Sequence, residues 1–534
     1  MTTELKTNKP IIWTISGSDC SGGAGIAADI KTGHMLGCEV CHLSTANTVQ
    51  NAKQLVAVNP VTVDILQQQA NCLLQDKTPQ IIKIGLIANR EQIHWLIDLL
   101  ASIKVNTPAL KVIYDPVGQA SVGGKFSALN STDLLPLLPY IDIVTPNTLE
   151  AKQLANLPLK NNPLTTHQLA KNIQNLGVNT VIIKGGHPLT DDPSDPSLAN
   201  QPATTCVDYC LHRLTDADSS KMSQDETIVY ELNSPRINTN YSHGGGCSFA
   251  SALAAFSAHG YLVRDAFTLS KAFINQGLTA NIGKREYYGA FEQTSWPTQA
   301  QHFPVINSEI TDKYQALPAF NKLGLSRKAA NSTSDKLGLY PVIDSLYWLE
   351  RLLPLKLNII QLRVKNKTAE ELDIIIKQAV ELNKQYPATR LFINDYWQLA
   401  IKHGAYGVHI GQEDLMTADL AQIQQAGLRL GISTHGCYEF LLAQQLQPSY
   451  LAIGAIFPTK TKDMTGQIQG IKNLTETLQL ATHIPVVAIG GINHQRAVEV
   501  LATGVDSIAV VTAITEAENP EASVALFNQL IAKS

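Results

Sequence analysis

Two glycine-rich turns in the first half of the chain could bind an anion. They span residues 16–25 and 242–247, and each is followed by a segment of helical composition. Glycine lets backbone amides approach a ligand closely, and amides at the start of a helix favour negative charge. The second turn holds Gly244, Gly245 and Gly246 in succession. Their amides could converge on a transferring phosphoryl group.

Cys247 directly follows these glycines and is the candidate proton acceptor. In or beside a first helical turn, the helix dipole and nearby donors would lower its thiol pKa. A thiolate there could take a proton from a substrate hydroxyl. A glycine turn followed by a buried cysteine explains the same residues equally well.

The turn at 16–25, which leads to Asp29 and Lys31, matches neither a P-loop nor a dinucleotide fingerprint.

In the second half, polar residues recur directly after predicted strands. In a parallel barrel these positions converge at the carboxyl face. Two cations, two carboxylates and later glycine and hydroxyl loops suit a Mg²⁺-diphosphate site beside a second phosphate site. Any one of these clusters could consist of polar loop residues that only face solvent. Seven clusters that all follow a predicted strand favour a shared site. The clusters are Gln361–Lys365, Asn394–Asp395, Gly411–Asp414, Ser433–His435, Thr459–Lys462, Gly490–Gly491 and Val511–Thr512.

Alternating strands and helices along residues 11–283 would position the two glycine-rich turns. Short Ile- and Val-rich runs alternate with helical segments, which predicts an open, mostly parallel α/β sheet covered by helices on both faces. Residues 188–226 lack periodicity and predict a long surface insertion, followed by a strand at 227–232.

The elements that would position the polar clusters of the second half begin after a linker region at 284–336. Eight short β-like runs then fall within residues 337–530, and most intervals have room for one helix. This rhythm predicts a (β/α)₈ TIM barrel, with a flavodoxin-like sheet as the main alternative.

Composition sets the class of protein. A chain of 534 residues exceeds one hydrophobic core and predicts two or three domains. Its formal net charge of -4 argues against nucleic acid and anionic membranes as general partners. The sequence has no long apolar run and no secretion signal at its start, so we expect a cytoplasmic protein. The pairs Cys38/Cys41 and Cys206/Cys210 favour buried or half-buried thiols over zinc or redox sites.

The first-half motifs resemble those of hydroxymethylpyrimidine/phosphomethylpyrimidine kinase, a ribokinase-fold enzyme of thiamine synthesis, over residues 10–283. The motifs are GSDCSGGAGIAADIKT, HGGGC, Thr145–Glu150, Lys184–His187 and Lys83–Gly85. The resemblance implies that Gly244, Gly245 and Gly246 form the anion hole and that Cys247 is the base. It also implies that Asn147 and Glu150 hold Mg²⁺ and phosphates through water, that Lys184 neutralises ATP phosphates, and that Gln50 and Asp29 serve the pyrimidine substrate.

Three positions depart from that family's pattern. Gly245 stands where the family has threonine, Leu86 stands where methionine is common, and residues 118–123 lack the family's lysine. These differences bear on the rate of the kinase, and on the second phosphorylation in particular.

The second-half motifs resemble thiamine-phosphate synthase over residues 337–530. They are LYPVID, QLRVK, FINDYWQLA, GVHIGQEDL, GIST-H, FPTKTK, VVAIGGI and IAVVTAI. The resemblance implies that Gln361 addresses the pyrimidine and that Asp395 and Asp414 coordinate Mg²⁺. It implies a diphosphate grip by Arg363, Lys365, Asn394, Ser433 and Lys462. It further implies a thiazole-phosphate cradle of Thr459, Thr461, Gly491, Val511 and Thr512.

Together these observations predict a bifunctional transferase of thiamine biosynthesis. It would use ATP and Mg²⁺, act on hydroxymethylpyrimidine, its phosphates and thiazole phosphate, and form a homo-oligomer. Three alternatives are a pyridoxal kinase-like first half, a first half that binds pyrimidine as a non-catalytic sensor, and a thiazole tautomerase-like barrel.

Overall fold

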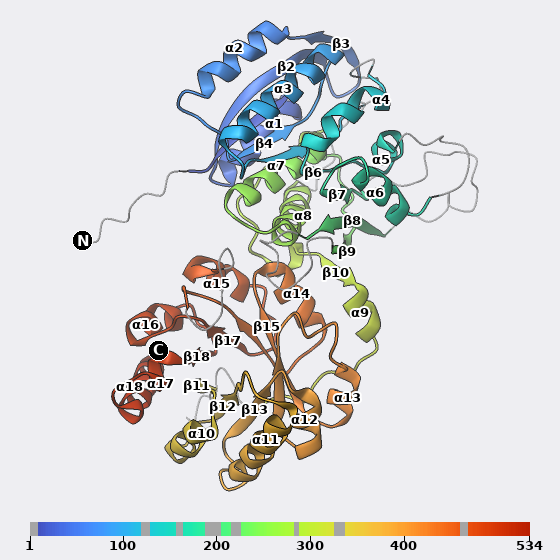
Figure 1. Cartoon of the computed structure of the whole chain (residues 1–534). Coiled ribbons are helices and arrows are strands. Elements are labelled where there is room, and N and C mark those ends of the chain that lie inside the picture. Colours follow the sequence, from blue (N-terminus) through green and yellow to red (C-terminus); the bar gives the residue numbers. More distant parts are fainter. Residues whose placement is uncertain are drawn as a thin grey trace. The chain divides into compact units, whose positions relative to one another are not determined.

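The computed structural model divides the chain into two compact units (Figure 1). They are Met1–Pro297 with Gln301–Ser308, and Thr298–Ala300 with Glu309–Ser534. The structure describes residues 9–118, 126, 129–155, 164–186, 204–214, 226–281, 288–324, 337–459 and 468–534.

A ten-stranded mixed sheet forms the centre of the first unit (Figure 1). In sheet order the strands are β10 (Val305–Ser308), β9 (Thr227–Pro235), β8 (Thr205–Arg213), β7 (Thr180–Ile183), β6 (Ile143–Val144), β5 (Lys111–Tyr114), β4 (Ile81–Ile84), β1 (Ile11–Asp19), β2 (Glu39–Gln50) and β3 (Leu55–Pro60). The strands from β7 to β2 are parallel, and the others pair antiparallel. The short central strands β4, β6 and β7 are buried throughout and mostly apolar, as expected of strands covered on both faces.

Helices cover both faces of this sheet, which confirms the predicted α/β architecture. One layer contains α2 (Val63–Leu73), α3 (Arg90–Asn106), α4 (Ser131–Leu134), the 3₁₀ helix η1 (Leu135–Tyr140), α5 (Thr148–Leu154) and α6 (Thr166–Gln174). The other contains α1 (Gly25–Met35), α7 (Gly245–Ala258) and α8 (Val263–Ala280). Every residue of α7 from Ser248 to Ser257 is buried, and most of them are alanine or serine, so this helix packs closely between its neighbours.

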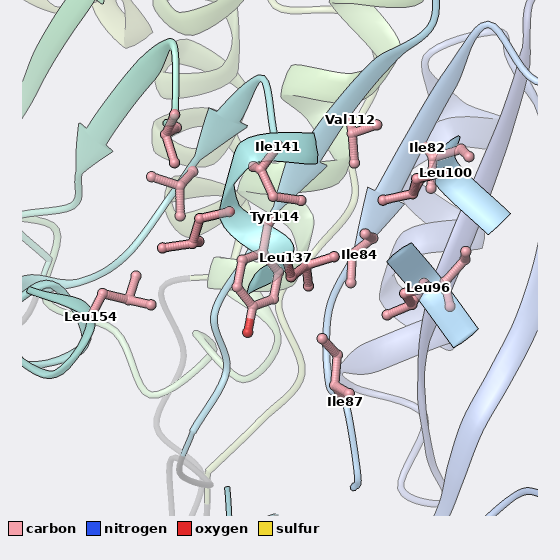
Figure 2. Packing of buried hydrophobic residues seen from close by; sticks show 14 of the residues in the cluster. Ile82, Ile84, Ile87, Leu96, Leu100, Val112, Tyr114, Leu137, Ile141 and Leu154 are labelled. Carbon is pink, nitrogen blue, oxygen red and sulfur yellow. The ribbon is translucent and has the colours of Figure 1, made fainter. Parts of the chain in front are cut away.

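The apolar core of the first layer fixes the strands whose ends carry polar residues (Figure 2). Ile84 of β4 and Tyr114 of β5 lie in the same cluster as Leu96 of α3, Leu137 of η1 and Leu154 of α5. Because these side chains point to one face, alternate residues of the same strands, such as Lys83, point to the layer of α1 and α7.

The predicted insertion at 188–226 was wrong in its middle. Residues 205–213 form β8, which pairs with β7 on one side and β9 on the other. Tyr209, Cys210 and Leu211 are buried there. Asp208 and His212 interrupt the apolar run of β8, so the sequence lacks the pattern of a buried strand, although tertiary pairing forms one here. The flanking residues 187–203 and 215–225 lie outside the described part of the chain.

A closed barrel of eight parallel strands forms the second unit, so the (β/α)₈ prediction is confirmed and the flavodoxin-like alternative is excluded. The strands are β11 (Gly338–Ile343), β12 (Ile359–Leu362), β13 (Arg390–Asn394), β14 (Gly407–Ile410), β15 (Arg429–Thr434), β16 (Tyr450–Ile453), β17 (Val486–Ile489) and β18 (Ser507–Val510). The helices are α10 (Leu346–Leu352), α11 (Ala369–Asn383), α12 (Trp397–His403), α13 (Leu420–Gln425), α14 (Cys437–Gln445), α15 (Gly470–Leu478), α16 (His494–Ala502), α17 (Thr512–Thr515) and α18 (Pro520–Lys533).

Residues 288–324, the described part of the predicted linker region, contribute to both units. The strand β10 extends the first sheet by pairing with β9. The helix α9 (Glu309–Tyr314) follows at once, and the Tyr314 hydroxyl donates to the Ala418 carbonyl of the barrel unit at 2.8 Å.

Two further expectations concern membranes and thiols. Among the described helices, none combines the length and apolar character needed to cross a bilayer. All eight cysteines lie outside any disulfide, with Cys38 buried and Cys41 half-buried, as the sequence predicted.

Candidate active sites

The two glycine-rich turns of the first unit lie against each other at the start of α7. Gly244 caps this helix with a positive φ of 83°. A Cβ atom on Gly244 would lie 1.8 Å from the carbonyl oxygen of Gly23, so only glycine allows this approach. Gly245 and Gly246 begin the helix, and Cys247 is its third residue. The structure therefore brings the predicted anion hole and Cys247 together at a positive helix end.

Asp19 holds this arrangement in place. Its carboxylate accepts hydrogen bonds from the backbone amides of Gly23 and Ala24 and pairs with His243 Nε2 at 2.9 Å. Burial alone would raise the pKa of Asp19, but hydrogen bonds from His243 and Ser21 hold it well below its ordinary value. Our sequence reasoning missed Asp19 and His243. The sequence did offer a signal for both residues, because Asp19 precedes the glycines of the first turn and His243 precedes the glycines of the second.

Gln50 lies at the end of β2, beside the same turn. Its backbone carbonyl accepts from the Cys20 thiol at 3.1 Å, and its side chain helps to lower the pKa of Asp19. The predicted pyrimidine residue is therefore close to the first glycine turn.

Asp29 of α1 is buried between the sheet and α7. Its carboxylate pairs with Lys83 of β4 at 2.9 Å, and each side chain is only 1% exposed. It also accepts hydrogen bonds from Thr14 and, at 2.7 Å, from the Ser251 hydroxyl. The structure thus places Asp29 in an internal polar network.

The thiol pKa predicted for Cys247 was wrong in direction. Burial raises the pKa of Cys247 to about 11, and the charge of Lys83 only partly opposes this. Desolvation of a thiolate outweighs the favourable charge here, so the ligand-free protein holds a neutral thiol.

Three polar residues follow neighbouring parallel strands; two of them were predicted as site residues and the third, Asp115, was not. Asp115 follows β5, Asn147 follows β6 and Lys184 follows β7, so they meet at one edge of the sheet. Lys184 Nζ pairs with Asp115 at 2.7 Å and lies 3.4 Å from the position of a Cβ atom on Gly246. The ammonium group is therefore beside the start of α7. Sequence reasoning did not assign a role to Asp115.

Asn147 and Glu150 form a capping box at the start of α5. The Asn147 amide donates to Glu150 Oε2 at 2.7 Å, and the Glu150 amide donates to Asn147 Oδ1 at 2.9 Å. Burial raises the pKa of Glu150 to about 7, although Lys184 opposes the shift. The spacing that suggested a ligand pair thus has a structural function as well.

In the second unit the predicted clusters do follow the strands of the barrel. Gln361 lies one residue before the end of β12, Asn394 ends β13 and Ser433 lies in β15. The other described members follow strands, and Thr512 begins α17. Gly491 has a positive φ of 64°, and a Cβ there would lie 2.6 Å from the Pro458 carbonyl oxygen. The loops after β16 and β17 therefore pack together. The described members at this face are Arg363, Lys365, Asp395, Asp414, Thr459, Val511 and Thr512, whereas Thr461 and Lys462 lie outside the described residues.

The donor set fits Mg²⁺. Asp395 adopts a positive φ of 66° directly after β13. Asp414 follows the neighbouring strand β14, and its Oδ2 accepts from the Gly411 amide at 3.1 Å. No group of three or more His, Cys, Asp or Glu suited to a metal occurs among the described residues. Two carboxylates suit Mg²⁺, which usually keeps waters and binds substrate phosphates.

Three side chains inside the barrel were missed by the sequence reasoning. Tyr340 and Tyr450 join hydroxyl to hydroxyl at 2.7 Å, and His409 contacts Tyr450 at 2.7 Å and Ser433 at 2.8 Å. The Gln361 amide donates to the Tyr340 hydroxyl at 3.1 Å. Tyrosine and histidine in apolar strands are typical of core, so only structure reveals this link between two site residues.

Comparisons with known proteins assign both units. Residues 19–292 match the model "Phosphomethylpyrimidine kinase", and residues 339–514 match "Thiamine monophosphate synthase". The thiamine-phosphate synthase of Yersinia pseudotuberculosis (strain IP 31758) is 56% identical over 200 residues, which is 38% of this chain and 93% of the relative. That of Salmonella schwarzengrund is 55% identical over 190 residues, or 36% and 90%. The chain belongs to both families. The resemblances drawn from the motifs are thereby confirmed.

Solved structures are also similar to parts of this chain. A Staphylococcus aureus pyridoxal kinase in complex with ADP is 25% identical and covers 56% of this chain and 98% of its own, with a TM-score of 0.45. Phosphomethylpyrimidine kinase from Clostridium difficile 630 is 27% identical, with 50% and 99% covered and a TM-score of 0.38. Thiamine phosphate pyrophosphorylase from Pyrococcus furiosus is 31% identical, with 38% and 98% covered and a TM-score of 0.34.

The family assignment identifies the first unit as a hydroxymethylpyrimidine kinase-like domain and the second as a thiamine-phosphate synthase domain. The chain is therefore a bifunctional transferase of thiamine biosynthesis. The interlocked glycine turns belong to the kinase domain, and the polar barrel face belongs to the synthase domain.

Proposed function

We propose that the kinase domain phosphorylates 4-amino-5-hydroxymethyl-2-methylpyrimidine and then its monophosphate with ATP. The synthase domain then joins the diphosphate to 4-methyl-5-(2-phosphooxyethyl)thiazole, giving thiamine phosphate and diphosphate. The observation that carries this proposal is the presence of both families in one chain, because the product of one reaction is a substrate of the other.

In the kinase domain, the amides of Gly244, Gly245 and Gly246 stabilise the transferring phosphoryl group, and Lys184 neutralises ATP phosphates. Their shared place at the start of α7 supports this assignment. Gln50 offers one donor and one acceptor to the edge of the aminopyrimidine.

Cys247 takes the proton of the substrate hydroxyl through its minor thiolate form. Lys83 favours that form, since its charge opposes the rise in the thiol pKa. Phosphoryl transfer passes through a loose transition state, so strong activation of the nucleophile is not required. Asp29 serves the substrate site through Lys83, to which it is paired.

Asn147 and Glu150 hold Mg²⁺ and phosphates through water. A carboxylate can accept several hydrogen bonds, so the capping contacts are compatible with this second role. Bound Mg²⁺ would neutralise phosphate charge at this edge of the sheet.

In the synthase domain, Arg363, Lys365, Asn394, Ser433 and Lys462 grip the diphosphate, and Gln361 orients the pyrimidine. Asp395 and Asp414 hold Mg²⁺, which supplies charge neutralisation for the leaving group. The bond between the pyrimidine methylene carbon and the diphosphate oxygen breaks, and the thiazole nitrogen captures the resulting cation. The thiazole phosphate rests on a cradle formed by Thr459, Thr461, Gly491, Val511 and Thr512.

The decisive experiment combines purified protein, MgATP, hydroxymethylpyrimidine and thiazole phosphate, and measures thiamine phosphate. Cys247→Ala should abolish this overall reaction but leave synthesis from supplied pyrimidine diphosphate unchanged. Asp414→Asn should abolish synthesis but leave the ATP-dependent formation of pyrimidine diphosphate. Cys72→Ala, at an exposed cysteine of α2, is the matched control. Equal loss of both reactions in each variant, at normal stability, would refute the separate sites.

Two further predictions concern the state of the protein. We propose that it forms a homo-oligomer, which light scattering on the purified chain tests. We also propose a cytoplasmic location, supported by eight cysteines that lie outside any disulfide. Fractionation of cells tests this location.

A further inference from the structure

A continuous hydrogen-bonded chain crosses the interior of the synthase barrel. It runs from Gln361 of β12 through Tyr340 of β11, Tyr450 of β16 and His409 of β14 to Ser433 of β15. Its four steps measure 3.1, 2.7, 2.7 and 2.8 Å. The two ends are the residues assigned to the pyrimidine and to the diphosphate.

The linking groups are buried and neutral. Tyr450 is 0% exposed and His409 is 6% exposed. The two ring nitrogens of His409 contact hydroxyl groups, those of Tyr450 and Ser433, so the buried imidazole is neutral and carries one ring proton. Burial raises the pKa of both tyrosines, so each keeps one hydroxyl proton. Every linking group therefore has a single hydrogen to donate along the chain.

Because each linking group has one hydrogen, all hydrogen bonds of the chain can donate in one of two directions, which we call its two polarities. In the first, the Gln361 NH₂ donates to Tyr340, Tyr340 to Tyr450, Tyr450 to His409 Nδ1, and His409 Nε2–H to Ser433. The Ser433 hydroxyl proton is then directed to another acceptor, and Gln361 Oε1 is turned away from Tyr340. In the second polarity every donor reverses, Ser433 donates to His409, and Gln361 must accept through Oε1.

We propose that this chain couples recognition of the two ends of the pyrimidine diphosphate, with Tyr340, Tyr450 and His409 as positioning residues. The inference rests on the proposed function of the barrel. An aminopyrimidine offers a donor, which requires Gln361 Oε1, and a phosphate offers acceptors, which require the Ser433 proton. Both ends select the first polarity, so binding of each favours binding of the other.

Neighbouring residues of the barrel leave space for the Tyr450 side chain and hold it in position. A Cβ atom on Gly431 of β15 would lie 2.4 Å from the Tyr450 hydroxyl oxygen, so glycine leaves the room that this hydroxyl occupies. Phe392 of β13 packs edge-on against Tyr450, with ring centroids 5.2 Å apart, and holds the ring in place. The hydroxyl is therefore fixed between Tyr340 and His409.

The test compares two ligands, pyrimidine diphosphate and its analogue in which a ring oxo group replaces the amino group. Calorimetry in Mg²⁺ measures how much Ser433→Ala weakens each. In the wild-type background we expect about a tenfold loss for the amino ligand and none for the oxo ligand, because an acceptor reverses the chain. In the Tyr450→Phe background, the loss should be the same for both ligands, because the two ends are no longer linked.

His409→Leu breaks the chain between Tyr450 and Ser433 and should reproduce that result if Tyr450→Phe fails to fold. Tyr406→Phe removes a hydroxyl that donates to the Leu323 carbonyl, outside the chain, and should retain the ligand-dependent difference. An equal Ser433→Ala effect on both ligands in the wild type, or a difference that survives both broken chains, overturns the coupling. Failure of the wild-type protein to make thiamine phosphate from pyrimidine diphosphate would instead overturn the proposed function.

Discussion

Asp29 and Lys83 form an ion pair at 2.9 Å within the core of the kinase domain, and each side chain is 1% exposed. Removing one partner leaves a buried charge without its counterion. We therefore expect Asp29→Asn to lower the free energy of unfolding by about 3–5 kcal/mol. Chemical denaturation followed by circular dichroism measures this loss.

The double variant Asp29→Leu/Lys83→Met removes both charges and should recover much of that stability. Glu381→Gln, in an exposed pair with Lys384, is the control and should leave unfolding unchanged. A single variant as stable as the wild type would show that the buried pair is not a structural requirement.

Gly244 and Gly245 give a matched pair of substitutions in one turn. Gly244→Ala meets the Gly23 carbonyl and a φ of 83°, so it should disrupt the anion hole and lower kinase turnover by about 100-fold or more. Gly245→Ala meets no atom within 4 Å and should keep kinase activity, with stability unchanged or slightly higher. Synthase activity serves as the internal control, and equal effects of the two substitutions would contradict the packing argument.

Cys247 should be slow to alkylate in the ligand-free protein at neutral pH. Only the thiolate reacts, and burial raises the pKa of this thiol to about 11. Labelling by iodoacetamide, read by mass spectrometry of the Cys247 peptide, should accelerate as the pH rises toward that value. Kinase turnover should rise with pH over the same range, because the proposed base is the thiolate. The exposed Cys72 provides the reference peptide. A turnover independent of pH would remove Cys247 as the base.

Asp395 combines a proposed ligand role with a strained backbone. Its φ of 66° is tolerated best by Asn, Asp and Gly. Asp395→Asn should fold normally, yet lose about 100-fold in synthase activity and require more Mg²⁺. Asp395→Ala should lose activity and also about 1–2 kcal/mol of stability. Unfolding curves and Mg²⁺ titrations of the synthase reaction separate the two effects. A wild-type Mg²⁺ dependence in Asp395→Asn would exclude a metal ligand.

The sequence predicted the strands and their polar ends well because parallel β/α folds repeat one simple relation. Each buried strand reads as a short apolar run, and the residues after it must reach the same edge or face. That relation placed Lys184, Asn394 and Gly491 at ends of strands without any knowledge of tertiary contacts.

Contacts that depend on side chains from distant elements could not be read in this way. Asp29 met its partners Lys83 and Ser251 only through packing of α1 and α7 on the sheet. Helix position suggested a low thiol pKa for Cys247, but the degree of burial, which decides its sign, is a tertiary property. β8 was missed because polar residues break its apolar run, and pairing on both sides stabilises it.

The junction at Ser308 and Glu309 limits how the two activities can be separated by truncation. A kinase fragment ending near residue 283 would lack β10 and leave the backbone of β9 as an unprotected sheet edge, a common origin of aggregation. A barrel fragment starting at 337 would lose the Tyr314 side chain, which bonds to the Ala418 carbonyl. Expression of either activity alone should therefore begin from a cut between these two adjacent residues.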